Sequence, residues 1–297
     1  MRVTDKLQII FHTGAHCTDE DRLLKCLLRN KEDLAAQKIS VPGPGKYRTL
    51  LKETIKAMET SAAAPGARDV LVDAILDDEI AERMILSNEH FFGSQRMALG
   101  DGMFYPDAPE RIASLKHLFE QDNVEIFMAI RNPATFLPAV LQKAPAQRVT
   151  EILGQCDPRN LRWSDLFARI TAAAPNVRLT VWCNEDLPLI WGELVRTMAG
   201  LDMGAKIAGN FDMLAEIMDK EGMQRFRVYL HQNPEMTIEQ RRRVIMAFLD
   251  KYAMDEELIE EIDLPGWSEA LVDAVTAAYE ADIDVIANLP GVRFLAP

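Results

Sequence analysis

Short apolar runs alternate with longer stretches of helical periodicity along the first two thirds of the sequence. Residues 7–12, 83–87, 124–130 and 177–183 are the runs that can form strands. The first and third are almost continuously apolar, which is typical of strands covered on both faces. Because strands that alternate with helices predict βαβ units, we expect an α/β fold with a central parallel sheet of four or five strands and helices on both faces.

Apolar residues at spacings of three and four predict a helix over residues 19–37, with Leu23 and Leu27 on its buried face. The segment VPGPGKYR, residues 41–48, predicts a rigid loop, because its prolines lack amide donors and its glycines permit tight bends. A second helix is expected over residues 50–61.

The pattern changes after about residue 211, where we expect no strand and further helices over 213–230, 238–252 and 267–287. The sequence therefore predicts an α/β domain at 1–210 and a helical region at 211–297 that packs on it. An acidic run in this region is interpreted as a solvated helix face; it comprises Asp255, Glu256, Glu257, Glu260, Glu261 and Asp263.

The charge balance narrows the possible partners. The 297 residues include 33 Lys and Arg against 46 Asp and Glu, a formal net charge of −13. An acidic protein repels polyanions, so binding to nucleic acid or to an anionic membrane is disfavoured. The net charge does not exclude a local basic pocket that binds a small anion. The N-terminal apolar run is too short for a signal peptide or a membrane span, which predicts a soluble, cytoplasmic protein. The spacing of the four cysteines predicts free thiols and no metal site.

The turn after the first strand, within IIFHTGAHCTDEDRLL, carries the most chemical information. A strand that ends in a glycine-containing turn and opens a helix can bind phosphate through backbone amides and the helix dipole. The nucleotide-hydrolase motif GxxxxGK[ST], aligned on Gly14, would require Gly, Lys and Ser or Thr at positions occupied by Asp19, Glu20 and Asp21. That motif is therefore absent.

The same turn resembles the 5′-phosphosulfate loop of the PAPS-dependent sulfotransferases, which reads approximately H-x-G-x-x-K-T-G-T-[ST] in bacterial members. His12, Gly14 and Thr18 match this pattern, whereas Cys17 stands in place of the lysine. The glycine and the two hydroxyl residues that follow are replaced by Asp19, Glu20 and Asp21.

Further segments resemble the family in the same order. SNEHFFG follows the second strand, where the family places its catalytic base, so Glu89 and His90 are the candidates. AIRNPATFLPAV is similar to the 3′-phosphate loop and contains Arg131, although Ala139 replaces its serine. NEDLPLIWGELVRTMAGLD is similar to the family's Y-E-D-L segment.

This resemblance covers about residues 7–205 and implies a P-loop-type fold with PAPS, or its product PAP, as the cofactor. It places the acceptor near Tyr47 and Arg48. The implied donor-binding residues are Gly14, His16, Cys17, Thr18 and Arg131.

The departures from the pattern predict a lost or remodelled donor site. Three carboxylates fall in the first helical turn, and two unit charges 4 Å apart repel by about 4 kcal/mol at an effective dielectric constant near 20. The same residues also suit ordinary helix capping, with Thr18 as N-cap and Asp21 three residues later. Structural interpretations stay open for the other candidates too: Glu89 and His90 as polar residues closing a strand, Arg131 as a capping or ion-pairing residue, and Tyr47 and Arg48 as loop anchors.

The favoured hypothesis is a sulfotransferase-like protein that is non-catalytic and acts as a binding or regulatory protein for a small molecule or a protein. The alternative is an active sulfotransferase that transfers sulfate from PAPS to a hydroxyl acceptor. In that case Glu89 or His90 would be the base and Arg48 or Lys46 would replace the missing lysine. A third hypothesis is a protein interaction module that uses the acidic helical region.

Overall fold

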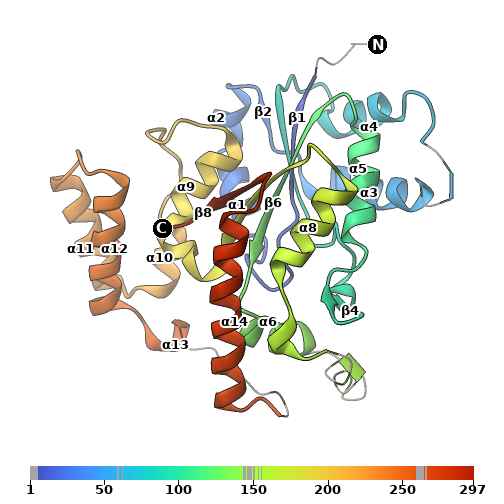
Figure 1. The fold of residues 1–297 in the computed structure, drawn as a ribbon. Helices are drawn as coiled ribbons and strands as arrows, with labels where there is room; N and C mark the ends of the chain where they lie inside the picture. The colour runs from blue at the N-terminus through green and yellow to red at the C-terminus, as the bar shows by residue number, and fades with distance from the viewer. Residues whose placement is uncertain are drawn as a thin grey trace.

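A six-stranded sheet forms the centre of the molecule (Figure 1). The computed structural model describes residues 6–58, 60–61, 63–142, 145, 149, 151–152, 154, 156–258, 264 and 266–297. The strand order is β2-β3-β1-β6-β7-β8, and every neighbouring pair is parallel. The strands are β1 (Gln8–His12), β2 (Ile39–Ser40), β3 (Arg83–Ser87), β6 (Asn123–Ile130), β7 (Arg178–Cys183) and β8 (Val292–Leu295). The predicted α/β class with a central parallel sheet is confirmed.

Helices connect the strands and cover both faces of the sheet. Those that precede β7 are α1 (Arg22–Arg29), α2 (Lys31–Ala35), α3 (Pro44–Met58), α4 (Ala67–Leu76), α5 (Ala108–Leu118), α6 (Pro133–Leu141) and α8 (Trp163–Ala173). Those that follow β7 are α9 (Leu187–Ala199), α10 (Asp212–Ile217), α11 (Lys220–Gln232), α12 (Ile238–Tyr252), α13 (Asp255–Leu258) and α14 (Glu269–Ala287). A small antiparallel hairpin, β4 (Leu99–Gly100) with β5 (Met103–Phe104), and 3₁₀ turns at Gln95–Met97, Pro158–Asn160 and Asn184–Asp186 complete the connections.

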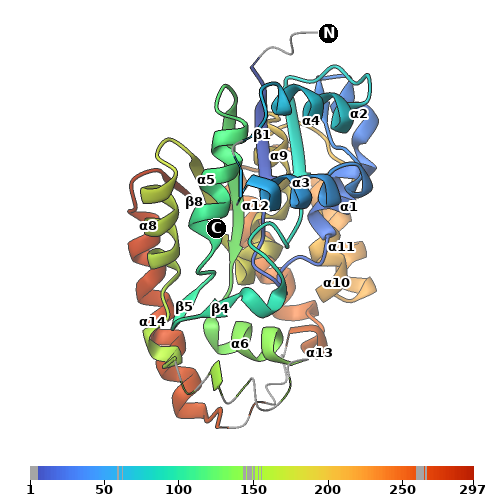
Figure 2. The same cartoon turned by 90° about the vertical axis from the view of Figure 1, so that its right-hand side faces the viewer.

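Alternate residues of each strand supply two separate hydrophobic cores, because successive side chains of a strand point to opposite faces. Ile9 and Phe11 of β1 join the core formed with α3, α4, α5, α8 and α14, whereas Ile10 joins the core formed with α1 and α9. Figure 2 shows α8 and α14 on one side of the sheet and α1 and α2 on the other. The buried strands therefore read as continuous apolar runs.

A third, smaller core lies away from the sheet, where α10, α11 and α12 pack around Phe226 and Ile245 (Figure 1). Unlike these helices, α14 packs on the sheet itself, with Tyr279 and Ile286 in the core shared with β1 and β6. The boundary predicted at residue 210 stays a prediction.

Two sequence-based expectations about strands are wrong. The sheet has six strands rather than four or five, and a strand does follow residue 211: β8 pairs with β7 from Leu179–Val292 to Trp182–Leu295. At four residues on the edge of the sheet, β8 is too short to produce a recognisable apolar run. The two-residue β2 escaped prediction for the same reason.

Helix boundaries also differ from the predictions. The segment expected to be a rigid loop begins α3 at Pro44, because the fixed φ of proline suits a first helical turn. The helix expected over 19–37 starts only at Arg22 and is interrupted at Asn30, whose side-chain amide donates to the carbonyl oxygens of Cys26 and Ala208.

Two of the three helices predicted in the C-terminal region are confirmed. The helix expected over 238–252 coincides with α12, and α14 takes the place of the one expected over 267–287. The helix expected over 213–230 divides into α10 and α11, because the Asp219 carboxylate accepts a bond from Gly222 N at 2.6 Å and starts a new helix.

The acidic run is exposed where it is described, over residues 255–257, while Glu260, Glu261 and Asp263 lie outside the described residues. Within the part of the chain that the structure describes, no helix is long and apolar enough to cross a membrane. All four cysteines are described, and none forms a disulfide.

Candidate functional site

The candidate residues gather where the parallel strands end. Loops after β1, β3, β6 and β7 meet at the edge of the sheet that faces α6 (Figure 1). β1 lies between β3 and β6, and the chain leaves it toward β2 and β3 on one side before returning to β6 on the other. In open α/β sheets such a change of direction opens a ligand crevice at the carboxyl ends of the strands.

The turn from β1 to α1 is held by its own side chains. Gly14 has φ of 53°, and a Cβ there would lie 3.4 Å from Thr18 Oγ1. Thr18 Oγ1 donates to the Ala15 carbonyl oxygen at 2.6 Å, so Thr18 braces the turn. The structure thus brings Gly14 and Thr18 into one tight loop.

The predicted capping arrangement is wrong. The N-cap of α1 is Asp21, which has left-handed backbone geometry and makes no side-chain cap bond, so Thr18 does not cap the helix. Asp19 serves instead: its Oδ2 accepts from Leu23 N at 3.1 Å, and its side chain is buried. A carboxylate therefore occupies the amide end of α1, where an incoming phosphate would otherwise interact with the helix.

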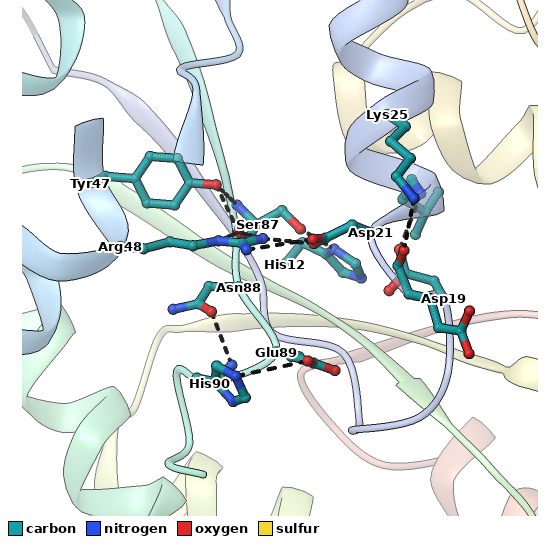
Figure 3. Close-up of polar contacts among 12 residues, drawn as sticks. His12, Asp19, Asp21, Lys25, Tyr47, Arg48, Ser87, Asn88, Glu89 and His90 are labelled. Carbon is teal, nitrogen blue, oxygen red and sulfur yellow. Dashed lines mark hydrogen bonds and ion pairs between the residues drawn. The ribbon is translucent and has the colours of Figure 1, made fainter. Parts of the chain in front are cut away.

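Tyr47 and Arg48 fasten the start of α3 to the end of β3 (Figure 3). The Tyr47 hydroxyl donates to Ser87 O at 2.7 Å and accepts from Ser87 N at 2.9 Å, and burial raises its pKa. Arg48 donates to the same carbonyl through Nε and Nη2, and its Nη2 lies 2.6 Å from Asp21 Oδ1. Both residues bind the backbone of Ser87, and Arg48 also pairs with Asp21.

A chain of polar side chains runs from the interior toward solvent through His16. The Tyr105 hydroxyl accepts from His16 N at 2.9 Å and lies 2.9 Å from His16 Nδ1, so its own proton is available to Nδ1. In the tautomer in which Tyr105 donates to Nδ1, His16 Nε2 carries the ring proton and lies 3.1 Å from His90 Nδ1. Burial, with the nearby His90, lowers the pKa of His16 to about 4, so His16 is neutral at pH 7.

Glu89 and His90 stand at the solvent end of this chain, with side chains about half exposed. Because His90 Nδ1 accepts from His16, the neutral His90 ring carries its proton on Nε2, which lies 3.8 Å from Glu89 Oε1. Burial raises the pKa of Glu89, and Asp21 and Asp19 act in the same direction. Figure 3 shows the two residues beside the Arg48–Asp21 pair. Of the two candidate bases, His90 uses Nδ1 in its contact with His16, whereas Glu89 lies beside His90 Nε2.

Arg131 binds the backbone of the turn between β1 and α1. It is buried, its Nη1 donates to Cys17 O at 2.5 Å, and its Nε donates to Thr135 Oγ1 at 3.1 Å. Cys17 itself has φ of 59° and is half-buried. The structure thus joins Arg131 to the predicted donor loop, with the guanidinium already bonded to protein oxygens.

His12, Tyr105 and Glu185 are polar residues of this edge that were not among the predicted site residues. The His12 ring stacks on Trp182, with 5.9 Å between ring centroids, and its Nδ1 lies 2.8 Å from Ser87 Oγ. His12 Nε2 is buried with no hydrogen-bond partner among the described residues, and burial lowers the pKa of this ring. In the sequence, only the match of His12 to the sulfotransferase pattern indicated that this residue belongs to the candidate site.

Glu185 ties the loop after β7 to two other elements. Its Oε1 accepts from Asn132 N at 2.7 Å, and its Oε2 accepts from the Tyr279 hydroxyl of α14 at 3.1 Å. Burial raises the pKa of Glu185. No spacing in the sequence indicates this contact, since Tyr279 lies 94 residues further along the chain. Among the residues described, no three His, Cys, Asp or Glu side chains are placed to hold a metal ion.

Comparisons with family models, with curated proteins and with solved structures give no match. The resemblance to the sulfotransferases therefore rests on the sequence segments and on their places in the fold. All four segments lie where a strand of the sheet ends, after β1, β3, β6 and β7.

Proposed function

We propose that this chain is a sulfotransferase-like protein of P-loop type whose donor site is remodelled, and that it acts as a non-catalytic binding or regulatory protein. The observation that carries the proposal is the Asp19 carboxylate, which accepts the Leu23 amide at the first turn of α1. A helix N-terminus that already holds a carboxylate has little affinity left for a phosphate.

The charges around the turn support the proposal. Burial raises the pKa of Glu89, the charges of Asp21 and Asp19 act in the same direction, and Arg48 is bonded to Asp21. Lys46, the other cation considered as a substitute for the missing lysine, pairs with Asp77 at 3.0 Å. A doubly charged phosphosulfate would therefore meet the Asp19 carboxylate at this turn, while Arg48 and Lys46 are already paired with other carboxylates.

The fold supports a P-loop-type identity. The strand–turn–helix unit of β1 and α1 lies centrally in a parallel sheet, where β1 pairs with β3 and with β6. The other segments with family resemblance follow the neighbouring strands and converge on the same edge. Four weak motifs that meet in space support a common site more strongly than four motifs scattered over the surface.

The test is a titration with adenosine 3′,5′-bisphosphate, followed by calorimetry and by the melting temperature. We expect no change in Tm for the wild-type protein at millimolar ligand. A paired Cys17→Lys, Asp19→Gly variant restores the lysine and the glycine of the family's loop and removes the carboxylate at the start of α1, so it is expected to gain binding, with a Tm increase of about 4 °C at a hundredfold excess over Kd. Wild-type binding that disappears in Arg131→Ala would overturn the proposal.

An active enzyme is the second candidate, and the contact between Arg131 and the donor loop favours it. Arg131 would bind the 3′-phosphate, and Glu89 would take the proton of the acceptor hydroxyl while His90 and His16 hold the loop in place. Transfer of labelled sulfate from PAPS to a panel of hydroxyl acceptors tests this candidate. Turnover that falls at least a hundredfold in Glu89→Gln would establish it, and absence of transfer would remove it.

A further inference from the structure

A small cavity separates α9 from the helical cluster of α10 and α12, away from the carboxyl edge of the sheet. Its volume is about 50 Å³, enough for a few water molecules or a small anion. Apolar side chains form part of the wall, among them Leu189, Trp191 and Ile245. The polar part of the wall is strongly cationic, and this sets the cavity apart in a chain of net charge −13.

Three arginines line the cavity against one carboxylate. Arg196 comes from α9, and Arg241 and Arg242 come from consecutive positions of α12. Glu193 pairs with Arg242 through Nη2 at 2.5 Å. Burial, together with the nearby Arg241, lowers the pKa of Arg196, so the two guanidinium groups repel each other in a poorly solvated place.

Several polar atoms of this wall have no hydrogen-bond partner in the part of the chain that the structure describes. Arg196 is bonded through Nε to Ala205 O and through Nη1 to Gly192 O. By contrast, Nε of Arg241 and Nε of Arg242 are buried without a partner, as is Oδ1 of Asn210. Buried donors and acceptors are nearly always satisfied, so atoms like these point to an unseen ligand or water.

Gly192 makes room for this arrangement. A Cβ at position 192 would lie 2.2 Å from Asn210 Oδ1 and 2.9 Å from Arg196 Nη1. Only glycine at position 192 leaves room for both Asn210 Oδ1 and the guanidinium of Arg196 beside the backbone of α9. The cavity is therefore shaped by its backbone as well as by its charges.

We propose that this cavity binds a small oxyanion that also carries a hydroxyl group, such as hydrogen phosphate or a short hydroxycarboxylate. Guanidinium groups bind carboxylate and phosphate oxygens with good geometry, and an anion between Arg196 and Arg241 would relieve their repulsion. The ligand hydroxyl would donate to Asn210 Oδ1. Because the wall comes from both α9 and α12, the bound anion would tie the helical cluster to the sheet.

The experiment uses the full chain and two pairs of probes at constant ionic strength. Inorganic phosphate is compared with sulfate, and lactate with propionate, because only the first member of each pair offers a hydroxyl donor at pH 7. We expect a Tm increase of about 4 °C at a hundredfold excess over Kd for phosphate, for lactate or for both, with at least fivefold weaker binding of the partner probe. The more effective pair distinguishes an inorganic from an organic ligand.

Two variants test whether the probe binds in this cavity. Arg241→Gln is expected to weaken the binding of the active probe at least tenfold, and it removes a repelled charge, so its ligand-free Tm should not fall. Arg243→Gln removes the same charge from an exposed neighbouring position that does not line the cavity, and it should change Kd less than twofold. No Tm shift with any of the four probes at 10 mM, or equal shifts in both variants, would overturn the proposal.

Discussion

Arg48 and Asp21 link the start of α3 to the start of α1 across the carboxyl edge of the sheet, with 2.6 Å between Nη2 and Oδ1. The same guanidinium donates twice to the carbonyl oxygen of Ser87 at the end of β3. One side chain thus holds three neighbouring segments of the candidate site together. At this edge of the sheet Arg48 therefore forms a structural ion pair, and its guanidinium points at the Asp21 carboxylate.

We expect Arg48→Ala to lower the free energy of unfolding by about 1–2 kcal/mol, because it removes an ion pair that is one-third exposed and two hydrogen bonds to one carbonyl. Urea denaturation measures this loss. A double-mutant cycle with Asp21→Ala should give a coupling of about 0.5–1 kcal/mol. Lys46→Ala breaks the exposed pair with Asp77 and should cost less than about 0.5 kcal/mol, so equal losses would contradict a special role for Arg48.

The central strands were predictable because they are buried on both faces. β1 and β6 contain hardly any polar residue between Ile9 and Phe11 or between Ile126 and Ile130, and such runs have few alternatives to a covered parallel strand. β8 has no such run, since it pairs on one side only and alternates exposed with partly buried residues. Its place in the sheet depends on how α14 packs against the sheet, and no local pattern specifies that packing.

The candidate site was predictable in its location and much less in its contacts. Segments that follow parallel strands must meet at one edge, so Glu89 and Arg131 could be assigned to that edge from the sequence. The bonds that define their roles connect positions far apart in the chain: His16 contacts Tyr105 from 89 residues away, and Cys17 contacts Arg131 from 114. Asp19 took the capping role predicted for Thr18 because left-handed residues at 20 and 21 turn the backbone before the helix begins.

Asp282 of α14 caps the start of α8, and its loss should be costly. Its Oδ2 accepts from Trp163 N at 2.7 Å and from Ser164 N at 3.2 Å, and its Oδ1 accepts from the Ser164 hydroxyl. The side chain is buried, so Asp282→Ala leaves these donors unsatisfied and should lower the free energy of unfolding by about 2–4 kcal/mol. Chemical denaturation tests this. Asp284→Ala, at an exposed position of the same helix, should change stability by less than about 0.5 kcal/mol.

Gly222 allows α11 to approach the end of α12 closely. A Cβ at this position would lie 2.4 Å from Tyr252 Cβ and 2.8 Å from Met218 Cγ, so Gly222→Ala should destabilise the protein by about 1–3 kcal/mol despite the better helix propensity of alanine. Gly45→Ala is the matched control, since it lies in α3 with nothing within 4 Å of its Cβ, and it should stabilise by about 0.5–1 kcal/mol. Thermal or urea unfolding of the two variants should give opposite signs.

His16 should make the protein less stable as the pH falls from about 6.5 to about 4. Its pKa is lowered from 6.5 to about 4 in the folded protein, chiefly by burial, so the unfolded chain binds more protons between these values. The stabilisation is complete above the unfolded pKa and is lost on acidification. His16→Asn keeps an acceptor for the Tyr105 hydroxyl but cannot titrate.

The free energy of unfolding of the wild type should therefore fall between pH 7.5 and pH 4.5 by about 2 kcal/mol more than that of His16→Asn. His12, whose pKa is also lowered, and Glu89, whose pKa is raised, are present in both proteins, so the difference between the two profiles isolates His16 together with its contact to His90. Urea denaturation at five pH values measures both profiles. Parallel profiles would mean that His16 has the same pKa in the folded and the unfolded chain, and would contradict the lowered pKa.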